Sequence, residues 1–108
     1  STIYQSNVSN ASATLMQEGL GNESIMTQSG NDQMAMVTQD GDMNLSTIMQ
    51  SDDNQMATVL QSSYYNTSSI LQSGLCAGNT AMVRQVVTSG NTSTITQSGT
   101  GNSATVSQ

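Results

Sequence analysis

The sequence has no His, Pro, Trp or Phe, and its only thiol is Cys76. Without His and with a single Cys, the chain cannot build a Cys/His zinc site, a Ser/His or Cys/His catalytic pair, or an internal disulfide. One Lys or Arg against seven acidic residues gives a net charge of −6, which argues against a basic patch for nucleic acid. We therefore expect a protein that is not an enzyme and takes no cofactor or metal.

Hydrophobic residues are also few. Hydrophobic residues make up 34% of the 108 positions and Tyr is the only aromatic type, which leaves little for a conventional mixed core. No apolar run approaches the roughly 18 to 20 residues of a membrane span, so membrane insertion is not expected. The chain starts without a charged and hydrophobic leader, so we expect a leader to have been removed if the protein is secreted. Its many Ser, Thr, Asn, Gln and Gly residues suit either disorder or ladders of stacked amides.

An internal repeat decides between these two possibilities. Ten Gln residues recur at spacings of 11 to 13 residues, and a second amide stands six positions before eight of them. We call the two positions the trailing Gln and the leading amide; Ala11 replaces the leading amide before Gln17. The predicted structural ladder consists of Asn22, Gln28, Gln33, Gln39, Asn44, Gln50, Gln55, Gln61, Asn66, Gln72, Asn79, Gln85, Asn91, Gln97, Asn102 and Gln108.

The residues between the amides alternate as in strands whose side chains point to opposite faces. The face shared with the amides carries Ser then Ile or Met in one strand, and Ala then Val or Leu in the next. The full unit is therefore about 22 residues with two strands and two short turns, repeated over 1–17, 22–39, 44–61, 66–85 and 91–108. We predict a single all-β domain, a cross-β solenoid of about five two-strand coils with two facing parallel sheets. Stacked amides would then hydrogen-bond to one another along both positions.

The repeat resembles a known family. Asn66 to Gln85 and Asn91 to Gln108 show its pattern of Asn, five residues, Gln, a Gly-rich turn, and the same again. The chain is similar to the curlin repeats of curli, the functional amyloid of bacterial biofilms, and within them to the major subunit, because it is acidic and regular. The resemblance implies secretion through an outer-membrane pore, nucleation by a minor curlin, and growth into extracellular, cell-surface fibres for adhesion. Gln33, Gln55, Ala11 and the Met content depart from the pattern.

The ends of the solenoid are predicted to join copies of the chain end to end. Gln5 and Gln17 would mark one assembly end and Gln97 and Gln108 the other, since no Pro, Lys or extra element closes either edge. The first coil lacks one leading amide and has Ala11 in place of another. We therefore expect the junctions between subunits to be weaker than steps inside a subunit.

Five acidic residues are candidate gatekeepers against premature assembly: Glu18, Asp40, Asp42, Asp52 and Asp53. Glu18 and Asp40 are 22 positions apart and would stack as like charges. The turn aspartates also have the composition of a calcium loop, but the Gly and Glu positions of an EF-hand are missing. Solvated turns are the favoured interpretation.

Two other functions stay open at this stage. Outward Thr92, Thr94 and Thr96 suit an ice-binding solenoid, although the adjacent coils do not repeat the array. The chain also suits a repeat fragment of a larger adhesin. Outward Met and Leu side chains favour either lateral fibre contact or simple strand propensity, and Cys76, in the longest turn, is either a crosslink or an unreactive surface thiol.

Overall fold

The computed structural model describes residues 1–6, 9–74 and 78–108, which form strands and turns. Within these residues no helix is present, and hence none that is long and apolar enough to cross a membrane. The strands are β1 (Thr2–Ser6), β2 (Ser12–Glu18), β3 (Glu23–Ser29), β4 (Met34–Asp40), β5 (Leu45–Ser51), β6 (Met56–Ser62), β7 (Thr67–Ser73), β8 (Thr80–Gln85), β9 (Thr92–Ser98) and β10 (Ser103–Ser107). The predicted all-β class is confirmed.

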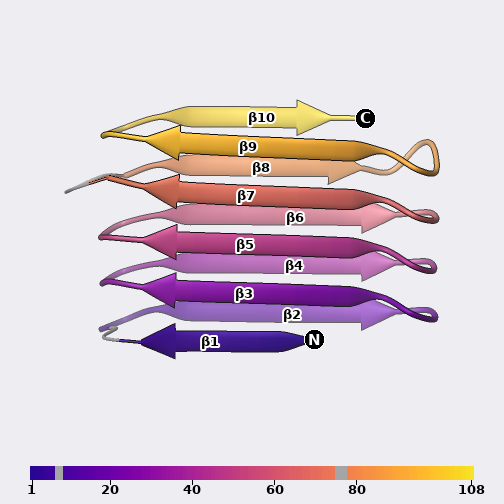
Figure 1. Ribbon diagram of the computed structural model, residues 1–108, viewed down its shortest axis with the longest axis horizontal. Coiled ribbons are helices and arrows are strands. Elements are labelled where there is room, and N and C mark those ends of the chain that lie inside the picture. Colours follow the sequence, from indigo (N-terminus) through magenta and orange to yellow (C-terminus); the bar gives the residue numbers. More distant parts are fainter. Residues whose placement is uncertain (7–8, 75–77) are drawn as a thin grey trace.

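Successive strands belong to opposite sheets. The odd sheet has the order β1-β3-β5-β7-β9 and the even sheet the order β2-β4-β6-β8-β10, and all pairings are parallel. Figure 1 shows the strands lying along the long axis of the molecule, with one coil stacked on the next. With extents of 36 × 23 × 13 Å, the molecule is a thin flattened solenoid. The prediction of about five coils with two facing parallel sheets is confirmed.

Equivalent residues of neighbouring coils are paired. Ile48 pairs with Ile70 in the odd sheet and Val37 with Val59 in the even sheet. The register survives the longer turns, because Gln72 still pairs with Gln97 although 25 positions separate them. The extra residues are thus absorbed outside the strands, as expected from the requirement that one face stays buried.

The core is a narrow seam between the two sheets. A strand exposes alternate residues, so each sheet contributes one face to this seam. Its fully buried hydrophobic residues are Met26, Ala35, Val37, Ile48, Ala57, Val59, Ile70, Ala81, Val83 and Ile95. Ala13, Leu15, Ala104 and Val106 occupy the same positions in the outer coils and are only partly buried, because no further coil covers them.

Stacked turns leave little room for side chains. Gly19 and Gly41 have φ near +100°, and a Cβ on Gly41 would collide with the carbonyl of Ser63 in the next coil. Ser63 itself occupies this column with φ +108°, a region that residues with a Cβ rarely adopt. The turn column therefore selects Gly, and Ser63 is a strained exception.

The two faces of a strand should respond differently to charge. Val59→Lys would bury an unpaired ammonium in the seam and should abolish the fold, whereas Thr58→Lys, on the half-exposed outer face, should cost little. Circular dichroism and protease resistance of both variants measure this difference. Equal damage from the two substitutions would contradict the assigned faces.

Candidate assembly site

The trailing Gln side chains form two continuous ladders through the seam. In each ladder the Nε2 of one Gln donates to the Oε1 of the Gln one coil further along the chain, at 2.6 to 2.9 Å. The odd ladder runs through Gln5, Gln28, Gln50, Gln72 and Gln97, and the even ladder through Gln17, Gln39, Gln61, Gln85 and Gln108. Since parallel strands repeat every ~4.8 Å, like side chains meet at hydrogen-bonding distance.

Eight of the ten trailing Gln residues, all except Gln5 and Gln17 of the first coil, also tie one sheet to the other. Gln50 Nε2 donates to the Met34 carbonyl at 3.1 Å, and Gln61 Nε2 donates to the Leu45 carbonyl at 3.0 Å. The same bond is made by Gln28, Gln39, Gln72, Gln85, Gln97 and Gln108. A primary amide has two N–H donors, so one serves the ladder and the other crosses the seam. The amide is thereby satisfied without water in a buried position.

The leading Asn residues use a different arrangement. Asn44 Nδ2 donates to the carbonyls of Asp40, in its own turn, and of Ser63, in the next coil. Its Oδ1 accepts from the backbone N–H of Asn66 at 3.0 Å. Asn22 and Asn79 bond in the same way. The expectation of side chain to side chain ladders at both amide positions is therefore wrong at the leading one, where the shorter side chain reaches the backbone instead.

Gln33 and Gln55 replace Asn at leading positions of the even sheet and lose much of this pairing. Gln33 Nε2 donates to the Ser29 and Asp52 carbonyls, but its buried Oε1 has no partner among the described residues. Gln55 is buried, and neither polar atom of its side chain finds a partner there. With one extra methylene, Gln33 keeps the bonds to both carbonyls and loses only the acceptor contact with the next coil, whereas Gln55 loses all of these bonds. Unpaired buried polar atoms cost free energy, so these two positions weaken the folded chain.

Both ends of the solenoid are open. The terminal strands β1 and β2 at one end, and β9 and β10 at the other, each pair on one side only within the chain (Figure 1). Ile3 is 45% exposed, while Ile48 at the equivalent interior position is 0% exposed. The predicted assembly residues Gln5 and Gln17 lie on the first coil, and Gln97 and Gln108 on the last. A seam that is complete inside the subunit is therefore uncovered at its ends.

The two open ends differ in hydrogen-bonding character. In both ladders the donor lies on the coil nearer the N-terminus and the acceptor on the coil nearer the C-terminus. Within the described chain, Gln5 and Gln17 therefore keep an unpaired Oε1 acceptor. Gln97 and Gln108 keep an unpaired Nε2 donor, since only one of their two amide hydrogens is used to cross the seam. Along the ladder direction, the acceptors of the first coil therefore complement the donors of the last coil.

The direction of the side-chain hydrogen bonds also decides which step between coils is weakened by Ala11. A leading Asn contacts the coil that follows it in the chain, as Asn22 Oδ1 does in accepting from Asn44 N–H. The amide that Ala11 lacks would thus have faced β4 inside the same subunit. By this pattern the missing amide weakens the step from β2 to β4, and the weakness expected at the junctions stays a prediction.

The five gatekeeper candidates fall into two groups. Glu18 and Asp40 are exposed and directly paired in the even sheet, so their like charges do stack. Three aspartates instead hold backbone N–H groups of neighbouring turns: Asp42 that of Leu20 at 2.7 Å, Asp53 that of Asn31 at 2.8 Å, and Asp52 that of Gly74 at 3.1 Å. These bonds were not predicted from the sequence. The signal for them was the spacing of 22 residues between Leu20 and Asp42, one full repeat, which places the two residues in neighbouring turns.

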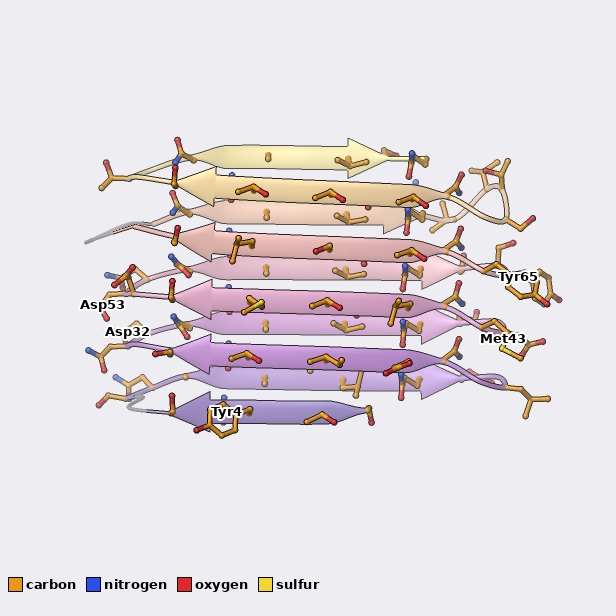
Figure 2. The ribbon with its side chains drawn as sticks, viewed as in Figure 1. Tyr4, Asp32, Met43, Asp53 and Tyr65 are labelled. Atoms are coloured by element: carbon orange, nitrogen blue, oxygen red, sulfur yellow. The ribbon has the colours of Figure 1, made fainter. Side chains whose placement is uncertain are left out.

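The acidic turn residues do not gather into a metal site in the part of the chain that the structure describes. There, no group of three or more His, Cys, Asp or Glu side chains is placed to hold a metal ion. Figure 2 shows Asp32 and Asp53 at the turn edge opposite the one that carries Met43 and Tyr65. Cys76, for which a crosslink or an unreactive thiol was considered, lies outside the described residues.

Comparison with known proteins identifies the repeat. Residues 9–41, which contain β2, β3 and β4, match the model of the curlin associated repeat. This match confirms the resemblance to the curlin repeat family. No curated protein and no solved structure matches the chain.

Restoring Asn at an exceptional position should stabilise the fold. Gln55→Asn should regain bonds to its own turn and to the next coil, raising the free energy of unfolding by about 1–2 kcal/mol. Gln50→Asn is the matched control and should destabilise by a similar or larger amount, because a shorter amide cannot span both the ladder and the seam. Denaturant unfolding measures both, and a destabilised Gln55→Asn variant would refute the explanation.

Proposed function

We propose that this chain, which carries the curlin repeat, is the structural subunit of an extracellular fibre that grows by end-to-end addition of identical copies. The observation that carries the proposal is the pair of open, complementary end coils. At each end the two Gln ladders stop with a hydrogen-bonding group unused, an acceptor oxygen on the first coil and a donor N–H on the last. An identical chain would supply the partner for each of these groups.

The register of the solenoid supports continuous stacking. When β1 of a second copy follows β9, Ile3 meets Ile95 and Gln5 meets Gln97, as Ile70 and Gln72 do inside the subunit. When β2 of that copy follows β10, Leu15 meets Val106 and Gln17 meets Gln108. The half-exposed hydrophobic residues of both end coils would then be covered, with a gain of ~25 cal/mol for each Å² of apolar surface buried.

The direction of the ladders favours head-to-tail growth. Gln97 and Gln108 present donors to the acceptors of Gln5 and Gln17 when unlike ends meet. When like ends meet, acceptor faces acceptor or donor faces donor. The Asn102 side chain adds an Oδ1 that would accept from the backbone N–H of Ala11, repeating the bond from Asn102 N–H to Asn79 Oδ1. The fibre is therefore polar, with chemically different ends.

The biological setting comes from the curlin repeat family. It supports secretion to the cell surface, a minor curlin as nucleator, an outer-membrane secretion pore, and a role in adhesion and biofilm matrix. The proposal includes no catalytic activity and no binding of nucleic acid. A repeat fragment of a larger adhesin shares the same fold, and spontaneous fibre growth by the isolated chain separates the two. Ice binding has less support, because Thr94 and Thr96 pair with Ser69 and Leu71 instead of with further Thr.

Replacing the end Gln residues should block growth selectively. The double variant Gln97→Ala/Gln108→Ala should slow elongation on unmodified seeds far more than Gln50→Ala/Gln61→Ala, since only the first pair removes donors from the growing junction. The interior pair should cost the folded subunit as much stability or more, because both residues are fully buried. Seeded growth rates, with unfolding free energies as the control, decide between them. Equal slowing by both variants contradicts end-coil templating.

Neutralising the acidic residues should accelerate assembly. The variant Glu18→Gln with Asp40, Asp42, Asp52 and Asp53 changed to Asn removes charge while keeping an oxygen that accepts from the turns. At low salt its lag phase should shorten, and the difference from the unmodified chain should narrow as salt screens the repulsion. Asp42→Ala is a useful contrast, since it also removes the bond to Leu20 and should lower stability. A longer or salt-independent lag would rule out a charge brake.

A further inference from the structure

Methionine is concentrated on one outer face of the solenoid. Five of the eight Met residues point outward from the even sheet, namely Met16, Met34, Met36, Met56 and Met82. On the outer face of the odd sheet, the described strands carry only Met49. This face is parallel to the stacking direction, so end-to-end assembly leaves it uncovered. Its composition is unexplained by the seam, the ladders or the turns.

Three of these side chains form a compact triangle. Met34 and Met36 lie two residues apart on β4 and share the outer face, so their Cα atoms are separated by about 6.7 Å. Met56 pairs directly with Met34 across the β4–β6 step, at about 4.8 Å. The three are 42% to 44% exposed, so each is partly covered by its neighbours while still reaching solvent. Met side chains are long and unbranched, which allows three sulfurs to converge above such a triangle.

The chemistry of three thioethers is selective. Thioether sulfur is a soft, neutral ligand that favours Cu(I) and related soft ions over Mg²⁺ or Ca²⁺, which need oxygen ligands. It carries no proton to lose near neutral pH. The residues paired with the triangle on neighbouring strands are Ser12, Thr14, Thr58 and Thr80, none of them charged.

We propose that Met34, Met36 and Met56 form a binding site for one soft monovalent metal ion, Cu(I) or Ag(I), on each folded subunit. The two ligands on β4 alternate with a buried Ala35, and the third comes from the adjacent coil, so only the folded solenoid brings all three together. The site does not depend on fibre growth. In a fibre it would recur once per subunit along the even face.

Other Met residues of the same chain provide internal controls. Met49 is alone on the opposite face and Met43 lies in a turn, yet they are 48% and 53% exposed, more than any member of the triangle. Met26 is fully buried in the seam. Binding that follows exposure alone would therefore favour Met43 and Met49, whereas binding that follows geometry would favour the triangle.

Silver(I) is the appropriate probe because it is not redox-active under these conditions. Folded chain with ¹³C-labelled Met methyl groups is titrated with AgNO₃ in chloride-free buffer and followed by NMR, in solution for the monomer or in the solid state for fibres. One equivalent should shift the signals of Met34, Met36 and Met56 and leave those of Met43 and Met49 unchanged. Shifts of all exposed Met signals in parallel, or no shift at all, would overturn the proposal.

Matched substitutions test the same site by affinity. Met34→Leu/Met56→Leu removes two of the three ligands and should weaken Ag(I) binding by more than the roughly ten- to hundredfold that loss of an outer-shell partner costs at a metal site. Met43→Leu/Met49→Leu should leave it unchanged, and Leu keeps the side-chain volume in both variants. Competition with a chromogenic Cu(I) chelator under ascorbate gives the corresponding Cu(I) affinities. Equal affinities for the two variants would mean that the face serves as an apolar contact surface and not as a metal site.

Discussion

The structure depends on the trailing Gln side chains, which form hydrogen bonds in two directions. Each interior trailing Gln gives one amide hydrogen to the Gln of the next coil and the other to the backbone of the opposite sheet. Stacking and closure of the seam are therefore coupled, since a coil cannot shift without breaking both bonds. The seam holds only a few hydrophobic side chains per coil, so these paired amides provide much of the cohesion that a larger core would supply elsewhere.

The same coupling leaves an unused hydrogen-bonding group on each outermost strand of the described chain. Every interior coil donates hydrogen bonds to the coil on one side and accepts them from the coil on the other. An outermost coil therefore has one set of donors or acceptors unused. A solenoid of this kind needs either a capping element or another copy, as stacked repeats generally do. Strands β9 and β10 carry the same types of inward side chains as the interior coils.

Departures from the repeat are concentrated in one region. Ala11, Gln33 and Gln55 are the successive leading residues before β2, β4 and β6, so the first half of the even sheet lacks the Asn links present in the odd sheet. Backbone pairing there is complete, with Ser12 N–H donating to Gln33 and Met34 N–H to Gln55. The coils of the odd sheet are therefore linked by Gln and Asn side chains as well as by the backbone. In this part of the even sheet the links are made by Gln side chains and the backbone, without Asn.

The sequence by itself determined the period, the strand positions, the buried and exposed faces, and the two parallel sheets. These follow from local rules, because side chains alternate along a strand and identical residues 22 to 25 positions apart must stack. It did not reveal how Asn44 and Gln50 differ, since both are amides at equally regular spacing. Only the tertiary structure decided that Gln spans the seam while Asn reaches the backbone, that both ladders point the same way, and that Asp42 and Asp53 hold neighbouring turns. The physical reason is that hydrogen bonds depend on where a side chain ends and on which groups surround that point, and only the folded coils fix both.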